Sequence, residues 1–210
     1  MTDIEKRGGL HGVEARAGDE KRTLVGYAAI FNSDTTIGDY FVERIAPGAF
    51  ADTIKGGDIR ALVDHDPGRV VGRTKSGTLR LVEDSKGLRA EIDVPDTSDG
   101  RDLWTLVERG DISGMSFGFR VTKQEWDESG DMPIRTIRGI ELFEVSAVAF
   151  PAYDDTSIGV RSLEAIRAEA EAARAEEQRK AENKAAAERR IAEKRALAEQ
   201  KFRGIRQDAS

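Results

Sequence analysis

The C-terminal stretch of the chain constrains the fold most, because it can form a helix but cannot supply a core. Residues 161–210 hold 14 alanines among Glu, Arg, Lys and Gln, with no proline, and these residue types are strong helix formers. Large apolar residues are too sparse there for a long heptad seam. They are Leu163, Ile166, Ile191, Leu197, Phe202 and Ile205. We therefore expect an extended charged helix over residues 161–210, and the globular part must come from the preceding residues.

Charge also separates the two parts of the chain. Residues 161–210 carry 13 Lys and Arg against 10 Asp and Glu, a net charge of +3, whereas the whole chain carries −6. An acidic body with a mildly basic tail indicates two different partners or environments. Two interpretations of the tail stay open: a solvated and partly frayed helix, or a partner-binding or targeting arm that orders on contact.

The body is typical of an α+β domain built from short strands. The clearest strand is the period of two over residues 88–94, where Leu88, Ala90, Ile92 and Val94 alternate with charged residues. Further strand-like runs occupy residues 23–31, 40–45, 59–63, 78–82, 112–120, 134–142 and 144–150, and helices are expected over 47–55 and 99–108. This pattern predicts a small, mostly antiparallel β-barrel with surrounding helices over residues 23–160. Residues 1–22 are polar and glycine-rich, which predicts a flexible lead-in.

Composition excludes several classes of site. The chain has no cysteine, which excludes disulfides, thiolate zinc sites and cysteine nucleophiles. His11 and His65 are the two histidines, too few for a zinc site built from three. No apolar run is long enough to span a membrane, and the start lacks a secretory signal pattern. We therefore expect a soluble protein that stays in the cytoplasm.

The candidate nucleophile lies in the run ISGMSFGFR, residues 112–120. Aromatic and β-branched residues favour a strand here, yet Gly114 and Gly118 interrupt it. Glycine weakens a strand unless the backbone must bend or something must come close. Ser116, between the two glycines, has room for an approaching substrate. The alternative is a bulged strand with a surface serine.

A serine nucleophile at neutral pH needs a general base, and the base needs an orienting group. His65 is the one histidine of the body; it follows an apolar strand and precedes an expected Pro67-Gly68 turn. Its alternative role is a hydrogen-bonded structural histidine. Glu144 is the candidate orienting acid, because a carboxylate inside an otherwise apolar strand needs a partner. An ion pair with an arginine is its alternative role, and Glu141 is the fallback acid.

The motifs around these residues resemble those of the tailed-phage prohead maturation proteases. His65 lies in LVDHD, Ser116 in GMSFGF and Glu144 in LFEVSAVAFPA, in that order along the chain. The early segment GYAAIF…ERIAPGAF also matches, with residues 47–50 (PGAF) as a family hallmark. The resemblance covers residues 23 to about 155 and leaves the tail uncovered. The family is similar in fold to the herpesvirus assemblins, which are β-barrels ringed by helices.

The resemblance implies a serine endopeptidase with Ser116 as nucleophile, His65 as base and Glu144 as orienting acid. Assemblins use a second histidine in place of the acid, and this chain has no spare histidine in its body. The resemblance further implies packaging inside the procapsid in the host cytoplasm, cleavage of the scaffold or of a scaffold-like segment of the capsid protein, and self-digestion. It implies no metal or organic cofactor, and it leaves self-association open.

Two other functions remain as alternatives. One is a non-catalytic assembly or scaffold protein that only binds capsid subunits. The other is a nucleic-acid binder that acts through the basic tail. Phe202 is the only aromatic residue of the tail and glutamate is mixed throughout it, which argues against strong phosphate or base binding.

Overall fold

The computed structural model describes residues 4–9, 12–17, 22–150 and 156–207. The chain divides into two compact units, residues 1–160 and 161–210. Within the described part of the chain, the strands of the first unit form a seven-stranded and a four-stranded sheet. The secondary structure is therefore mixed α+β with mostly strands in the first unit, in agreement with the expected class.

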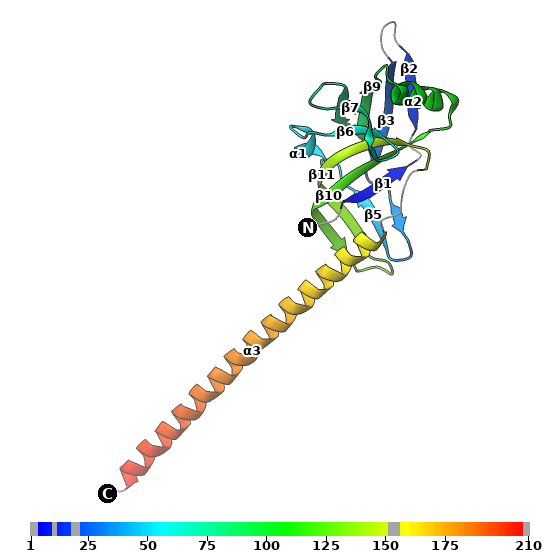
Figure 1. Ribbon diagram of the computed structural model, residues 1–210. Coiled ribbons are helices and arrows are strands. Elements are labelled where there is room, and N and C mark those ends of the chain that lie inside the picture. Colours follow the sequence, from blue (N-terminus) through cyan, green and yellow to red (C-terminus); the bar gives the residue numbers. More distant parts are fainter. Residues whose placement is uncertain (1–3, 10–11, 18–21, 151–155, 208–210) are drawn as a thin grey trace. The chain divides into compact units, whose positions relative to one another are not determined.

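The seven-stranded sheet is built around one long hairpin (Figure 1). The strands β10 (Gly114–Asp127) and β11 (Ile134–Val148) are antiparallel neighbours over most of their length. The outer edge of β10 carries β1 (Glu5–Gly9). On the other side, the first half of β11 pairs in parallel with β5 (Phe41–Ile45), and β4 (Thr35–Ile37) follows. The second half of β11 pairs in parallel with β6 (Arg60–Val63), which pairs with β7 (Asp66–Arg73).

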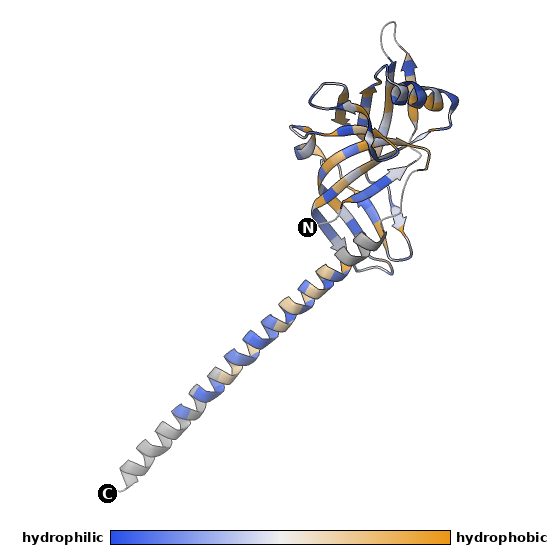
Figure 2. Ribbon diagram, in the orientation of Figure 1, coloured by the Kyte–Doolittle hydropathy of each residue, from blue (hydrophilic) through white to orange (hydrophobic). Residues whose placement is uncertain are grey.

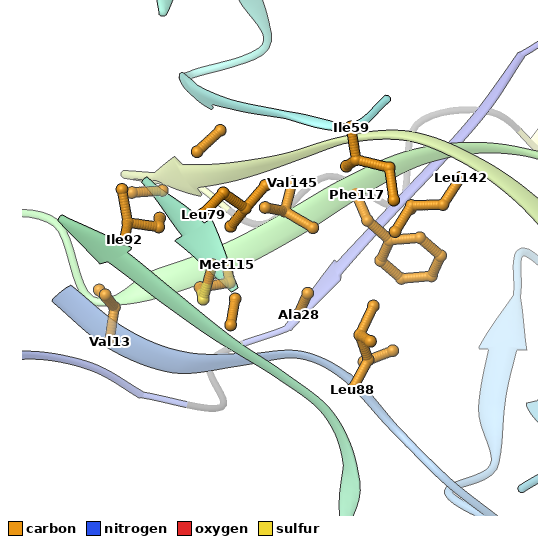
Figure 3. Close-up of a cluster of buried hydrophobic side chains, with 14 of the residues drawn as sticks. Val13, Ala28, Ile59, Leu79, Leu88, Ile92, Met115, Phe117, Leu142 and Val145 are labelled. Atoms are coloured by element: carbon orange, nitrogen blue, oxygen red, sulfur yellow. The ribbon is translucent and has the colours of Figure 1, made fainter. Parts of the chain in front are cut away.

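The four-stranded sheet is antiparallel throughout. Its order is β2 (Val13–Ala17), β3 (Arg22–Ile30), β9 (Gly87–Asp93) and β8 (Leu79–Glu83). The helices of this unit are α1 (Ala51–Ile54) and α2 (Ser98–Arg109). The main hydrophobic cluster draws on both sheets: Figure 3 shows Leu88 and Ile92 from β9 with Phe117 from β10 and Val145 from β11. The predicted period of two over residues 88–94 is thus β9, with its apolar side in the core.

The predicted closed barrel is wrong, because hydrogen bonding organises the described strands into two open sheets instead. The two sheets are joined by backbone hydrogen bonds from Val13 N–H to the Ser113 carbonyl at 3.2 Å and from Asn32 N–H to the Ile45 carbonyl at 2.9 Å, and they also pack through side chains. Met115 of β10 lies against Gly26 of β3 so closely that a Cβ added at Gly26 would be 2.7 Å from the Met115 sulfur. A side chain held between two backbones keeps them too far apart to form a ladder.

The predicted lead-in also differs from the structure, since β1 and β2 both lie within residues 1–22. Glu5 and Arg7 of β1 are almost fully buried. They form a buried ion cluster with Glu43 of β5 and Arg135 of β11: Arg135 contacts Glu5 at 2.8 Å and Glu43 at 2.9 Å, and Arg7 contacts Glu43 at 2.8 Å. Burial alone lowers the pKa of Arg135, but the hydrogen bonds that it donates to Glu5 and the charges of both carboxylates raise that pKa above its ordinary value. This ion cluster explains how a polar segment becomes a buried strand.

The second unit is helical, as expected. Its described residues belong to α3 (Thr156–Gln207). All of the side chains described between residues 164 and 190 are exposed, and Figure 2 shows hydrophilic residues recurring along them. The ion pair of Lys180 with Glu176 joins residues one helical turn apart. None of the described helices is both long and apolar enough to cross a membrane.

Candidate active site

A tight turn places His65 at the end of the β6–β7 hairpin. Asp64 and His65 both adopt positive φ, 52° and 59°, the left-handed conformation that a two-residue hairpin turn requires at both positions. The prediction of a turn at Pro67 and Gly68 is wrong, because those residues lie within β7. Left-handed backbone in residues other than glycine is uncommon and gathers at functional sites. Because β6 pairs with β11, this turn delivers His65 beside the second half of β11.

Glu144 of β11 bonds directly to that histidine. The distance from His65 Nδ1 to Glu144 Oε1 is 2.7 Å, and the two side chains are 10% and 13% exposed. An irregularity in the β10–β11 ladder aims the carboxylate. Gly118 pairs with Glu144 whereas the next residue, Phe119, pairs with Leu142, so β11 contains one extra residue there. Such bulges re-aim side chains, and this one lets Leu142 face the core while Glu144 faces away from it.

Gly118 makes room for the carboxylate. A Cβ added at Gly118 would lie 2.5 Å from Glu144 Oε1, closer than real Cβ contacts. The sequence predicted that the two glycines of this strand leave room for an approaching substrate, with a bulged strand as the alternative. At Gly118, the group that approaches is the side chain of Glu144.

Ser146 connects the acid to the turn. Its hydroxyl donates to Glu144 Oε2 at 2.6 Å, and its oxygen accepts the backbone N–H of His65 at 3.2 Å. Sequence reasoning did not select this residue as a site member. The signal was present, because the alternation of β11 places Ser146 on the same face as Glu144.

Ser116 lies on the neighbouring strand, level with Ser146. The two serines are direct partners in the β10–β11 ladder, so their side chains share one face. Ser116 is fully buried, and its hydroxyl donates to the backbone carbonyl of Arg7 at 2.8 Å. The structure therefore joins His65 to Glu144 directly and brings Ser116 onto the same face, but the Ser116 hydroxyl points to β1 rather than to His65.

The other ring nitrogen of His65 is available. Nε2 is buried, and it has no hydrogen-bond partner among the residues that the structure describes. An imidazole whose Nδ1–H is held by a carboxylate carries its free lone pair on Nε2, which is the atom that takes a proton from a serine in acyl-transfer enzymes. The arrangement suits proton transfer from a nearby hydroxyl.

The fallback acid lies apart from this group. Glu141 is half exposed and pairs with Arg120 at 2.7 Å. The ion pair between Glu144 and an arginine, considered from the sequence, is not among the described contacts; Arg138 instead pairs with Glu125. His11 lies outside the described residues. In the described part of the chain, no group of three or more His, Asp or Glu side chains is placed to hold a metal ion.

Comparison with known proteins finds prohead proteases both by family model and by sequence. A family model described as caudovirus prohead serine protease matches residues 11–169. The prohead protease of Escherichia phage T5 is 32% identical over 99 residues, which are 47% of this chain and 44% of that protein. The prohead protease of Enterobacteria phage HK97 is 33% identical over 162 residues, which are 71% of this chain and 67% of that protein. Among solved structures, the capsid assembly protease of bacteriophage T4 matches with a TM-score of 0.45 at 13% identity, covering 69% of this chain and 95% of that one.

Proposed function

The chain belongs to the caudovirus prohead serine protease family, and from this premise we propose that it is a serine endopeptidase of procapsid maturation. Ser116 is the nucleophile, His65 the general base and Glu144 the acid that orients the base. The observation that carries the assignment is the 2.7 Å contact between His65 Nδ1 and Glu144, which leaves Nε2 of the histidine without a partner among the described residues.

The mechanism begins with a rotation of the Ser116 side chain. Its hydroxyl must leave the carbonyl of Arg7 and donate to Nε2 of His65; hydrogen bonds of this kind often tighten only when substrate binds. Ser116 then attacks the peptide carbonyl while His65 takes the proton and later gives it to the leaving amine. Glu144 holds the Nδ1–H tautomer and stabilises the imidazolium. Backbone N–H groups stabilise the oxyanion, and water hydrolyses the acyl-enzyme.

The substrate that we propose is the scaffold, or a scaffold-like segment of the major capsid protein, cleaved inside the procapsid in the host cytoplasm. Self-digestion follows, so a second copy of the chain is also a proposed partner. The family description supports a role in the prohead. The charged helix α3, exposed over its described side chains between residues 164 and 190, suits an arm that brings the protease to a helical scaffold segment.

Processing of co-expressed capsid protein, followed by intact mass, tests this function. Ser116→Ala should abolish processing while the protein still folds, because loss of a nucleophile lowers the rate by roughly a millionfold in a well-measured serine protease. Ser113→Ala is the matched control, since Ser113 is an exposed serine of the same segment, and it should cut normally. His65→Ala should be as inactive as Ser116→Ala, and His11→Ala should be normal.

Two outcomes would contradict the proposal. Continued cleavage by folded Ser116→Ala would contradict the assignment of Ser116 as nucleophile. Normal cleavage by both histidine variants would contradict the assignment of His65 as general base. A wild-type protein that binds capsid subunits without changing their mass would favour the non-catalytic assembly protein instead.

A further inference from the structure

We propose that Ser146 is a positioning residue of the protease, a fourth member of the site that fixes both the acid and the turn carrying the base. This inference rests on the proposed function, because positioning has meaning only if His65 and Glu144 act on Ser116. Ser146 is fully buried on β11 and has no contact with bulk solvent.

Ser146 fixes the orientation of the Glu144 carboxylate. A carboxylate held through one oxygen can turn about its last side-chain bond, and a broad range of such angles is accessible. The Ser146 hydroxyl holds Glu144 Oε2 at 2.6 Å, within the short range of a charge-assisted bond. The other oxygen, Oε1, then stays aimed at Nδ1 of His65.

Ser146 also holds the backbone of the turn. The oxygen of Ser146 accepts the N–H of His65 itself, at 3.2 Å. His65 adopts a left-handed conformation, which is unfavourable for a residue other than glycine unless its surroundings hold it. One hydroxyl thus fixes the backbone of the base and the side chain of its partner, and it does so beside Ser116, its direct neighbour across the ladder.

A purely structural hydroxyl would satisfy a buried N–H and do nothing more. The chain offers such a case for comparison: Thr53 of α1 accepts, through Oγ1, a hydrogen bond from the backbone N–H of Leu142 on β11 at 3.0 Å. Thr53→Val removes that hydroxyl at constant shape, and the bond that it removes involves neither Glu144 nor His65 directly. It is therefore the matched control for Ser146→Ala.

The first readout is the rate at which a fluorophosphonate probe labels Ser116, because this needs an activated serine but no known substrate. We expect Ser146→Ala to label about 10- to 100-fold more slowly than wild type, the range for one lost hydrogen bond to a charged group. Thr53→Val should label at the wild-type rate, even if urea unfolding shows an equal loss of stability in both variants.

The second readout is the tautomer of His65. The chain has two histidines, so ¹⁵N-histidine labelling in a His11→Gln background leaves a single imidazole in the NMR spectrum. At roughly pH 9, where an ordinary histidine is neutral, we expect the Nδ1–H form in the wild type and a mixture with the Nε2–H form in Ser146→Ala. Thr53→Val should keep the wild-type spectrum.

The outcomes separate the two proposals. Wild-type protein that does not react with the probe, or Ser116→Ala that reacts normally, would overturn the proposed function. Normal labelling and an unchanged His65 spectrum in folded Ser146→Ala would overturn the positioning role alone. If Ser146→Ala does not fold, Ser146→Thr and Ser146→Val form a pair of equal volume that differs in the hydroxyl, and equal labelling by both would overturn the role.

Discussion

Replacement of Glu144 by glutamine gives the sharpest test of the site, because it keeps the shape of the side chain and removes its charge. Each carboxylate oxygen has its own hydrogen-bond partner: Oε1 lies beside Nδ1 of His65, and Oε2 accepts a hydrogen bond from the Ser146 hydroxyl. A glutamine has only one oxygen to offer. If its NH₂ group faces Nδ1, the imidazole must place its proton on Nε2, and the base can no longer take a proton from Ser116.

The magnitude follows from the same geometry. Glu144 and His65 are 13% and 10% exposed, so an effective dielectric constant near 20 is appropriate, and two unit charges about 4 Å apart then attract by about 4 kcal/mol. If the imidazolium loses that stabilisation, the rate of cleavage falls roughly a thousandfold. The wrong tautomer extends the loss toward about ten thousandfold, as in a Ser-His-Asp protease with the equivalent change. Both values stay below the roughly millionfold expected when the nucleophile itself is removed.

The assay is single-turnover cleavage of purified capsid protein, compared among Glu144→Gln, Ser116→Ala and wild type. Glu141→Gln is the control on the same strand. The side chains of its partner Arg120 and of Glu141 are 34% and 48% exposed, and ion pairs near the surface contribute about 1 kcal/mol or less, so Glu141→Gln should cleave at the wild-type rate. A Glu144→Gln protein within about tenfold of wild type would refute the orienting role. An inactive Glu141→Gln beside an active Glu144→Gln would identify the fallback acid as the right one.

Three further predictions concern the groups around the site and the tail. Gly118→Ala should fold but lose most activity, because the new Cβ would lie 2.5 Å from a Glu144 carboxylate oxygen, whereas Gly130→Ala, with its nearest contact at 3.9 Å, should remain active. Arg135→Met should lower the free energy of unfolding in urea by about 3 to 5 kcal/mol, since it leaves two buried carboxylates with a single arginine; a loss below about 1 kcal/mol would contradict this. Removal of residues 163–210 should leave peptide cleavage intact but reduce packaging into purified procapsids, and equal packaging of inactive full-length and truncated proteins would refute the targeting role.

Local sequence patterns were sufficient where a segment determines its own structure. The period of two at residues 88–94 became β9, and the alanine-rich tail became α3. They failed at β1, where the residues are polar and the stabilising partners are distant in sequence. Arg7 bonds to Glu43, and Glu5 bonds to Arg135, 130 residues away. A pattern read over ten residues cannot contain such a pairing, so the segment was predicted to be flexible.

The contact between His65 and Glu144 follows from the sequence, whereas the geometry that produces it does not. An acid in an apolar strand and a lone body histidine each need a partner, and the structure pairs them. The bulge that turns Glu144 away from the core, and the turn at Asp64 and His65, depend on the packing of three strands. The alternation of β11 places Ser146 on the face of Glu144, but its hydrogen bond to the backbone of His65 depends on the position of the turn, so Ser146 went unselected.

The register between β10 and β11 determines both which side chains face the site and which face the hydrophobic core. Glu144 and Ser146 alternate along β11 with Val145 and Ala147, which are fully buried in the hydrophobic cluster. A slip by one residue would exchange the two sets, placing a carboxylate in the core and apolar side chains outside it. The free-energy penalty for burying that charge unpaired is far larger than any gain at the site. The hydrophobic core therefore fixes which strand positions meet His65 and Ser116, and the left-handed turn and the bulge need only adjust the aim of side chains that the register has already brought together.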